Sequence, residues 1–365
     1  MNKIFNKIPI YFLYLLTFSL ISIPLIYSAC KIMPKEYNYL YLKEIIFYIF
    51  SFIVFFIIMK IKNYKIYRSI NYIYIINIFL LVLVLFIGQE INNTKAWINT
   101  PLFSFQPSEF MKLSLTLLLC FKAYNYNFKL KNLKSDIIFI FKLILITAIP
   151  CILVFIEPDT GSVISYIIIF FTVLFFSSIK KIWKYIILIS ITLLISLFIF
   201  MYSYHQSKII NIFGNDIFYR INRIIDWKKS SGMQLENSLI AVGSSPIKGY
   251  GFLNTPVYFP EPYTDFIFSV YASNYGLIGS FLLLFLILTF LLNILETCKK
   301  SNNLMDKYTL LCFFTCFLFS YIENISMTLG LVPISGIPLP FISYGGSSLI
   351  VYTIILSMIN NCAHT

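Results

Sequence analysis

Long apolar stretches separated by short polar segments run through almost the whole chain. A transmembrane helix needs about 20 largely apolar residues. Stretches of that kind lie near residues 8–29, 43–60, 70–88, 108–126, 137–156, 161–178, 183–203, 265–294, 308–330 and 341–361. The pattern therefore predicts an all-α integral membrane protein with about ten transmembrane helices. The turn at 157–161 is so tight that 137–178 could instead be one span and a remnant.

One polar segment, residues 204–264, is much longer than the others and follows the seventh predicted span. Long loops on a rigid scaffold are frequent places for binding and chemistry. We expect a single membrane domain over residues 1–365 with this loop on the outer side. The chain has no internal repeat, so its sequence gives no support to an inverted-repeat transporter.

Composition agrees with the apolar pattern. The chain is 59% hydrophobic and 12% charged, with a mean hydropathy of +0.83, whereas a soluble domain is about half apolar and a quarter charged. The net charge of +13 does not indicate a nucleic-acid partner, because the Lys and Arg residues cluster in short segments between apolar stretches. The seven cysteines lie in or near apolar spans without a CxxC pair, so we expect neither a disulfide nor a cysteine metal site.

The distribution of basic residues predicts the orientation. With the N-terminus inside, the inner segments carry sixteen Lys and Arg residues and the short outer segments carry four. The positive-inside rule then places both termini on the cytoplasmic side of the membrane. No small-residue cleavage site follows the first span at a convincing position, so we expect it to be retained.

Ionisable residues at membrane depth are costly, and here most of them gather at the outer ends of spans. Glu109 and Lys112 are i,i+3 neighbours on the helix that Pro107 begins, and they can form an ion pair. The pair could be purely structural, or it could orient a catalytic carboxylate or a phosphate.

Two aspartates also stand directly before apolar helices. Asp159 is well placed to cap the helix that begins near Gly161, and we favour capping over catalysis. Asp265 has aromatic neighbours on both sides, so its carboxylate would be partly desolvated and a better general base near neutral pH. An N-cap is an equally good explanation for Asp265.

The long loop and the last loop carry the remaining candidates. Arg223 and Lys248 could bind phosphate, although exposed basic residues are usually only solvated. The Gly- and Pro-rich stretch 330–348 implies irregular backbone at membrane depth, which is tolerated only against protein or a watery cavity. We therefore expect a re-entrant loop that lines a site.

These blocks, in this order, resemble the SEDS family (shape, elongation, division and sporulation), whose best-known members are RodA and FtsW. The most specific pieces are FQPSEF at 105–110, PDTGS at 158–162, the Ala-Val-Gly-Ser to Gly-Tyr-Gly stretch at 241–251, TDFIF at 264–268 and GIPLPFISYGGSS at 336–348. The resemblance implies a peptidoglycan glycosyltransferase that polymerises lipid II at the outer face of the cytoplasmic membrane. It also implies a class B penicillin-binding protein as partner. GIPLPF and the compact length look more like RodA, which acts in elongation and cell shape.

The resemblance also implies roles for individual residues. Asp265 matches the family's essential aspartate and catalytic base, with Glu109, Lys112, Asp159 and Ser343 in supporting positions. The candidates for substrate binding are Lys95, Trp97, Gln106, Arg223, Lys248 and Tyr344. Lipid II has an α-linked pyrophosphate and the glycan is β-linked, so one inverting displacement suffices. Basic residues or a divalent ion such as Mg²⁺ or Mn²⁺ could receive the pyrophosphate.

Some family positions differ in this chain. Ala96 replaces an Arg, Glu157 and Asn237 each replace a Gln, and Ser273 and Asn274 replace a pair of Glu. The loss of two acids near Asp265 could lower its pKa or weaken a metal site.

Two other functions stay open on the sequence alone. A lipid II flippase would need charged groups along a path through the bilayer, but Lys142 lies near an inner end and Glu323 is the only deep acid. The departures favour a non-catalytic scaffold for a penicillin-binding protein, whereas the retained Asp265, Glu109 and Lys112 disfavour it.

Overall fold

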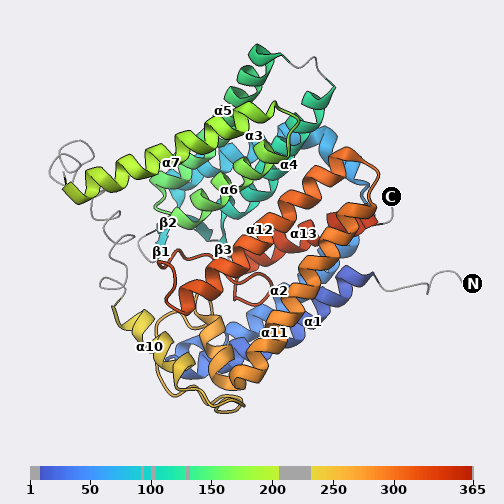
Figure 1. Ribbon diagram of the computed structural model, residues 1–365. Helices are drawn as coiled ribbons and strands as arrows, with labels where there is room; N and C mark the ends of the chain where they lie inside the picture. Colours follow the sequence, from blue (N-terminus) through green and yellow to red (C-terminus); the bar gives the residue numbers. More distant parts are fainter. Residues whose placement is uncertain (1–8, 92–93, 100–103, 129–131, 205–231, 364–365) are drawn as a thin grey trace, which may run out of the picture.

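Ten long helices make up most of the computed structural model, which describes residues 9–91, 94–99, 104–128, 132–204 and 232–363 (Figure 1). They are α1 (Ile10–Ile32), α2 (Leu40–Met59), α3 (Asn63–Ile87), α4 (Pro107–Asn127), α5 (Leu133–Ile156), α6 (Thr160–Phe176), α7 (Lys181–Tyr204), α11 (Ile267–Lys300), α12 (Leu304–Thr328) and α13 (Gly346–Ala363). Each coincides with one predicted apolar stretch. The fold is therefore the multi-pass helical membrane architecture that the sequence predicts, and α5 and α6 are two separate helices.

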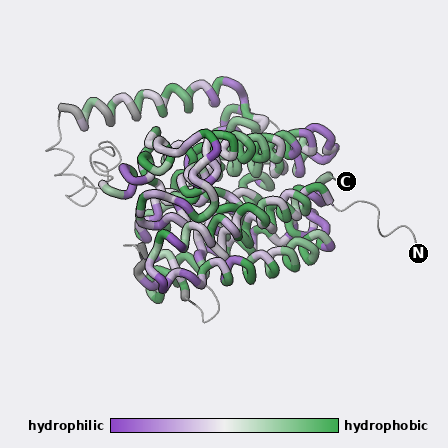
Figure 2. Tube along the Cα trace, turned by 90° about the horizontal axis from the view of Figure 1, so that it is seen from below, coloured by the Kyte–Doolittle hydropathy of each residue, from purple (hydrophilic) through white to green (hydrophobic). Residues whose placement is uncertain are grey.

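The apolar character of these helices suits a bilayer. Seven of the described helices are long and apolar enough to cross a membrane, and α6, with 17 residues, is slightly shorter. Large apolar side chains such as Phe79, Phe86 and Phe281 are exposed on the helix surfaces. Hydropathy along the chain is high through the middle of the helices and low near their ends (Figure 2). Lipid is the solvent that these exposed side chains require.

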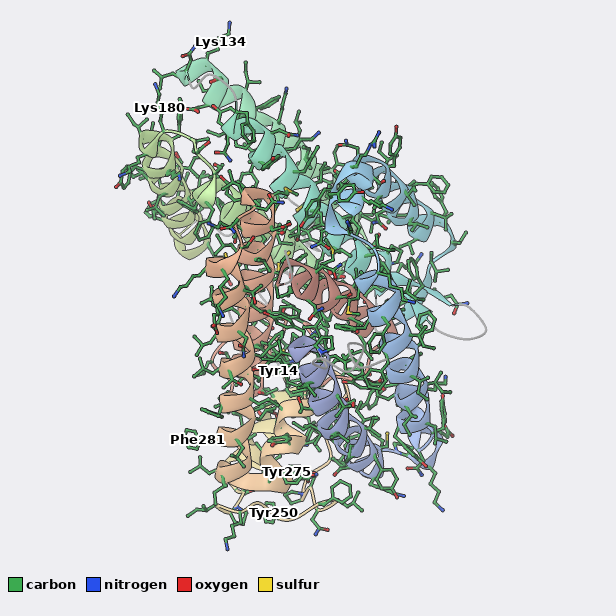
Figure 3. All side chains as sticks on the ribbon, turned by 90° about the vertical axis from the view of Figure 1, so that its right-hand side faces the viewer. Tyr14, Lys134, Lys180, Tyr250, Tyr275 and Phe281 are labelled. Carbon is green, nitrogen blue, oxygen red and sulfur yellow. The ribbon has the colours of Figure 1, made fainter. Side chains whose placement is uncertain are left out.

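The two ends of the bundle differ in chemistry. Lys134 and Lys180 lie at one end, and Tyr250 and Tyr275 lie at the other (Figure 3). The start of α1 and the end of α13 lie on the side away from α10 and the strands (Figure 1). Helix α7 runs beside the bundle and packs little against it (Figure 2).

Short elements cover the end opposite to the termini. A 3-10 turn, η1 (Lys35–Tyr37), precedes α2, and α10 (Gly232–Gly243) lies within the long loop. Strands β1 (Gln89–Ile91), β2 (Thr94–Asn99) and β3 (Ser104–Phe105) form an antiparallel sheet in the order β1-β2-β3. These three short strands are a local addition to the all-α architecture that the sequence predicts. The sequence pattern did not predict them, because short strands between two spans lack the long apolar run by which membrane helices are identified.

Helix α11 is interrupted near its N-terminal end, where Gly276 has φ 64° and ψ −159°. The break exposes backbone groups, and the long loop pairs with them. The amides of Tyr250 and Gly251 donate to the carbonyls of Ser273 (2.9 Å) and Asn274 (3.0 Å). The long loop therefore holds the N-terminal piece of α11, which begins two residues after Asp265.

The Gly- and Pro-rich segment between α12 and α13 is irregular backbone, as predicted for 330–348, and most of its residues from Ile337 onward are buried in the protein. The Phe341 ring stacks on Phe18 with centroids 5.2 Å apart, and the Phe341 carbonyl accepts a hydrogen bond from Tyr48. Ser22 donates to the carbonyl of Ile342 over 2.9 Å. Helices α1 and α2 thus supply the partners that a bilayer could not.

Candidate active site

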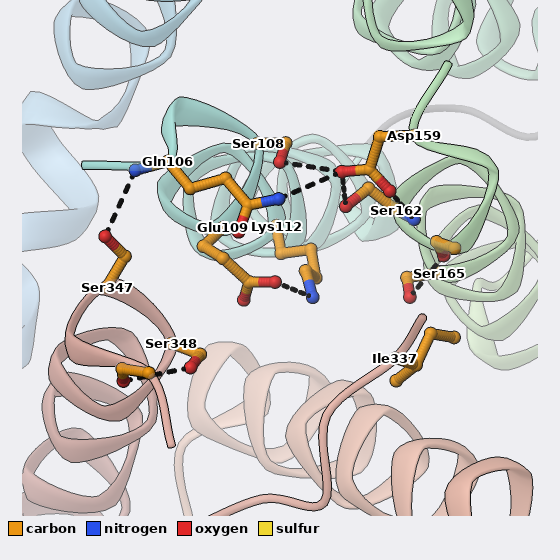
Figure 4. A network of polar contacts seen from close by, with 12 residues as sticks. Gln106, Ser108, Glu109, Lys112, Asp159, Ser162, Ser165, Ile337, Ser347 and Ser348 are labelled. Atoms are coloured by element: carbon orange, nitrogen blue, oxygen red, sulfur yellow. Dashed lines mark hydrogen bonds and ion pairs between the residues drawn. The ribbon is translucent and has the colours of Figure 1, made fainter. Parts of the chain in front are cut away.

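Asp159 links the starts of two helices (Figure 4). Its Oδ1 accepts from the Ser162 amide (3.0 Å), which caps α6 as predicted. Its Oδ2 accepts from the hydroxyls of Ser108 (3.0 Å) and Ser162 (2.7 Å) and from Gln106 Nε2 (3.2 Å). The prediction of a capping residue is confirmed, and the same carboxylate also ties α6 to the beginning of α4.

Glu109 and Lys112 form the predicted ion pair in the first turns of α4. Lys112 Nζ lies 2.7 Å from Glu109 Oε1, and the two side chains are 11% and 4% exposed. Pro107 occupies the first turn, where a missing amide hydrogen costs nothing. The pair is largely shielded from water, so each charge depends on the other.

Asp265 lies in the loop immediately before α11. The N-cap of that helix is Phe266, without a side-chain cap, so the N-cap alternative for Asp265 is wrong. Asp265 as a whole residue is half-buried. Burial, then the negative charges of Glu261 and Asp159, raise the pKa of Asp265 to about 7. The pKa of Asp265 thus lies above the ordinary range of an aspartate although Ser273 and Asn274 stand in place of the family's Glu pair.

The last loop clamps the segment that carries Asp265. Ser343 Oγ donates to the Thr264 carbonyl (2.6 Å) and accepts from the Leu339 amide (2.8 Å). The Tyr344 amide donates to the Tyr263 carbonyl (2.9 Å), and the rings of these two tyrosines meet edge to face at 5.8 Å. Ser343 and Tyr344 thus fix the backbone on the N-terminal side of Asp265.

Glu157, two residues before Asp159, differs from Asp159 in its burial and in its hydrogen bonding. It is fully buried, and neither carboxylate oxygen finds a hydrogen-bond partner among the described residues. Burial, and then the charge of Asp159, raise the pKa of Glu157 to about 8. Gly161 on the same turn allows close approach of the last loop, because a Cβ there would lie 2.7 Å from the Ser335 carbonyl.

The other predicted site residues are distributed around this centre. Gln106 follows β3 directly, and its backbone amide donates to Ser347 Oγ of α13 (3.1 Å). Lys95 and Trp97 lie on β2, which pairs with β3, with Lys95 exposed and Trp97 half-buried. Lys248 is exposed in the part of the long loop that braces α11. Arg223 lies outside the described residues.

At three of the positions that differ from the family pattern, the side chain is buried or forms hydrogen bonds with uncharged groups. Asn274 donates to Ser28 Oγ (2.5 Å) and accepts from Thr255 (3.0 Å). Asn237 donates to the Tyr258 carbonyl (2.7 Å), and Ala96 is buried. These positions therefore serve packing and loop attachment in this chain.

Sequence reasoning missed two contributors on α12. Asn324 Nδ2 donates to the carbonyls of Asp265 and Ile337, both at 2.9 Å, and so joins the two site loops. Glu323 is buried beside it and close enough for its charge to interact with that of Asp265. Glu44 and Glu109 are also buried in the protein, but both lie in the first turns of their helices. The sequence signal that could have identified Asn324 and Glu323 is the adjacent Glu and Asn within an apolar span.

A metal site was left open by the sequence. In the parts of the chain that the structure describes, no group of three or more His, Cys, Asp or Glu residues is arranged to hold a metal ion. Of the acids near Asp265, Asp159 is engaged with hydroxyl and amide donors.

The geometry supplies a carboxyl group, on the half-buried residue Asp265, whose pKa is raised to about 7 and whose neighbouring backbone is held by hydrogen bonds. Such a group can accept a proton from a bound hydroxyl and release it to water. The site lies at the bundle end opposite to the described termini, where α10 and the sheet also lie (Figure 1). An amphiphilic substrate could reach it from the adjoining bilayer.

Comparisons with known proteins agree with this arrangement. A sequence model of the FtsW, RodA and SpoVE cell-cycle proteins matches residues 6–365. The chain is 34% identical to a probable peptidoglycan glycosyltransferase FtsW of Wigglesworthia glossinidia brevipalpis, over 95% of this chain and 91% of that protein. It is 29% identical to the corresponding Haemophilus influenzae protein, over 80% and 73%.

Two solved structures share the fold. One belongs to a peptidoglycan synthase complex that coordinates polymerization and crosslinking (TM-score 0.76, 22% identity, 97% of this chain and 96% of that one). The other is the rod shape determining protein RodA of Thermus thermophilus (TM-score 0.70, 22% identity, 100% and 98%).

Proposed function

Since this chain belongs to the FtsW, RodA and SpoVE family, we propose that it is a bacterial peptidoglycan glycosyltransferase that polymerises lipid II at the outer face of the cytoplasmic membrane. It acts as one membrane domain with its active site at the outer end of the bundle. Both termini face the cytoplasm.

The observation that carries the proposal is the raised pKa of Asp265 together with the hydrogen bonds that hold its backbone. Its pKa is raised to about 7, and its backbone is held by Asn324, while Ser343 and Tyr344 hold the two residues before it. A general base works best when its pKa is near the operating pH. Fixed backbone on both sides keeps the carboxylate in place while substrates bind and leave.

Asp265 removes the proton from the acceptor sugar hydroxyl as that oxygen attacks the anomeric carbon of the donor. The bond from this carbon to the pyrophosphate oxygen breaks, and the pyrophosphate leaves with the electron pair. The single displacement inverts the α-linkage to β. The proton on Asp265 then passes to water.

Positive charge is needed where the pyrophosphate departs. Lys95 and Lys248 are exposed at the same end of the molecule and can attract the anionic headgroup. Lys112 is committed to Glu109, so its role is to fix the start of α4, from which Gln106 and Ser108 reach Asp159.

The direct test is lipid II polymerisation by purified wild type and Asp265→Asn, each with its partner. We expect glycan strands from the wild type and none from the variant, with unchanged folding by thermal melting. Glu296→Gln, an exposed acid at the other end of the bundle, is the control and should retain full activity. Equal polymer from Asp265→Asn would remove Asp265 from the mechanism.

The flippase is tested in vesicles that contain fluorescent lipid II in the inner leaflet. The polymerase predicts no protein-dependent translocation. Movement of lipid II together with loss of polymerisation would reverse the assignment.

For the partner we propose a class B penicillin-binding protein that cross-links the strands. The likeness to the chain of a peptidoglycan synthase complex supports this assignment. Co-purification of the two membrane proteins, followed by activity with and without the partner, tests it.

For the subtype, GIPLPF and the compact chain favour RodA, whereas the curated relatives reported above are named FtsW. We give weight to the relatives, because one of them aligns over nearly the whole chain, and propose a role in cell division. Complementation of strains depleted of FtsW or of RodA separates the two: rescue of division supports FtsW, and rescue of rod shape alone supports RodA.

A further inference from the structure

Glu261, four residues before Asp265, has a backbone conformation that favours glycine. Its φ is +53°, in the left-handed region where a Cβ is sterically unfavourable. Non-glycine residues in this region persist where the surrounding structure holds them, and they are frequent at active sites. The contacts of Glu261 therefore indicate what the strained backbone is for.

The carbonyl of Glu261 closes the chain around Asp265. It accepts hydrogen bonds from the backbone amides of Thr264 and Phe266, both at 3.4 Å. Phe266 directly follows Asp265 and is the N-cap residue of α11. The two hydrogen bonds make residues 261–266 a single turn that contains Asp265.

The carboxylate of Glu261 holds the side chains of the two residues before Asp265. Its Oε2 accepts from Thr264 Oγ1 (3.0 Å), and the Tyr263 hydroxyl is also a hydrogen-bond partner. The last loop holds the backbone carbonyls of the same two residues. Tyr263 and Thr264 are therefore fixed by backbone contacts from the last loop and by side-chain contacts from Glu261.

We propose that Glu261 is a positioning residue for Asp265: its carbonyl and its carboxylate keep the turn 261–266 closed and so hold the Asp265 carboxylate in place before α11. This inference rests on the proposed function for its catalytic consequence. A displacement of about 1 Å at a reacting group can reduce a rate about 100-fold. A turn that is held from within therefore contributes directly to the rate.

The place of Glu261 also has an electrostatic consequence. Burial raises the pKa of Asp265 most, followed by the charge of Glu261 and then that of Asp159. Glu323 on α12 is a further acid whose charge interacts with that of Asp265. Removal of the Glu261 charge should therefore lower the pKa of Asp265, whereas removal of a neutral hydrogen-bond donor from the turn should not.

The first test compares Glu261→Gly with Glu261→Gln in lipid II polymerisation. Glycine adopts φ +53° without steric cost but has no carboxylate, whereas glutamine keeps an oxygen that can accept from Thr264 Oγ1. We expect kcat to fall about 10- to 100-fold in Glu261→Gly, with KM changed by less than about threefold, and to fall only a few-fold in Glu261→Gln. Both variants should melt within a few degrees of the wild type.

The second test removes the donor on the other side of the contact. Thr264→Val should lower kcat about tenfold, and Thr264→Ser should restore it. The double variant Glu261→Gly with Thr264→Val should be no worse than Glu261→Gly alone, because both changes remove the same interaction. Thr264→Val also decides the matter if Glu261→Gly does not fold. Wild-type kcat in Thr264→Val or in folded Glu261→Gly, or equal losses in Glu261→Gly and Glu261→Gln, would overturn the proposal.

The third test is an infrared titration that does not depend on activity. The protonated carboxyl band of Asp265 is identified as the band lost in Asp265→Asn. We expect its midpoint to fall by roughly half a pH unit to one unit in Glu261→Gln. The midpoint should stay at the wild-type value in Thr264→Val and in the control Glu236→Gln, which changes an exposed acid on α10. An unshifted midpoint in Glu261→Gln would overturn the proposal. A wild type that makes no polymer would refute the proposed function, while this titration would still decide whether Glu261 acts on Asp265.

Discussion

The backbone around Asp265 is anchored independently of its charge. Asn324 holds the Asp265 carbonyl, and Ser343 and Tyr344 hold the carbonyls of the two preceding residues. The carboxylate can therefore gain or lose a proton without moving the loop. At this scale the difference between a structural and a catalytic acid is visible: Asp159 is saturated with donors, whereas Asp265 is half-buried and its pKa is raised to about 7.

The first prediction concerns pH. Only the ionised carboxylate of Asp265 accepts a proton, and its pKa is raised to about 7. We therefore expect kcat for lipid II polymerisation to be constant above that pH and to fall about tenfold for each further unit below it. Initial rates between pH 5 and 9 measure the profile. A midpoint near pH 4, the ordinary range of an aspartate, would contradict this assignment.

Glu157 gives the second prediction. Its pKa is raised from 4.5 to about 8, so between these values the unfolded chain releases a proton that the folded chain keeps. Stability must then fall as pH rises through that window, and the loss is complete above about pH 8. Glu157→Gln should melt higher than the wild type at pH 8 by a few degrees and show little difference at pH 4.5. Melting curves in detergent across this range measure the effect, and an equal shift at both pH values would contradict it.

The buried ion pair gives the third prediction. Lys112→Met leaves the Glu109 carboxylate buried and unpaired, which costs about 3–5 kcal/mol. The double variant Glu109→Gln with Lys112→Met should recover most of that loss, as measured by thermal melting. Lys300→Met breaks the exposed pair with Glu296 and should have no measurable effect. A double variant no more stable than Lys112→Met would show that the lysine acts through packing.

At the scale of elements, the broken helix α11 shows how the long loop reaches the site. The loop supplies the hydrogen bonds that the break at Gly276 would otherwise leave unmade, including the Ile278 amide to the Ile247 carbonyl (3.2 Å). The N-terminal piece of α11 is thus fixed from one side by the loop and from the other by Asn274 with Ser28. Asp265 lies just before this braced piece, so loop attachment and site geometry are coupled.

The fourth prediction tests that coupling. Gly249 has φ +78°, and a Cβ there would lie 2.2 Å from the Asn274 carbonyl oxygen. Gly249→Ala should therefore destabilise the protein by at least about 1–2 kcal/mol and expose the neighbouring Lys248 to faster cleavage by trypsin. Gly243→Ala is the matched control, because a Cβ at that position meets nothing within 4 Å. Equal cleavage rates in both variants would show that the loop is not held through this contact.

Local patterns predicted the elements well and their connections poorly. The ten spans followed from apolar length alone, and the ion pair and the Asp159 cap followed from spacing on a single helix. The break at Gly276 was not predictable, because it depends on hydrogen bonds from a distant loop. The same holds for the residues that join the site, since Asn324 contacts a residue 59 positions away and Gln106 one 241 positions away.

At the scale of the whole molecule, the charge distribution predicted from sequence and the architecture of the structure distinguish the same two ends of the bundle. The inner segments predicted from sequence carry the basic residues, and the structure gathers Lys134 and Lys180 at one end and Tyr250 and Tyr275 at the other (Figure 3). The site residues lie toward the second end, with α10 and the sheet. An even number of spans is consistent with termini on one side of the membrane.

This arrangement gives the fifth prediction, on orientation. Lys134 and Lys248 are both exposed and lie in segments predicted to be on opposite sides, so each is replaced singly by cysteine. A membrane-impermeant maleimide should label Lys248→Cys in intact cells, but Lys134→Cys only after permeabilisation. The parent chain controls for its own cysteines, which are buried or half-buried. Labelling of Lys134→Cys in intact cells would place the basic end outside and separate Asp265 from an external substrate, because the positive-inside rule would then fail for this chain.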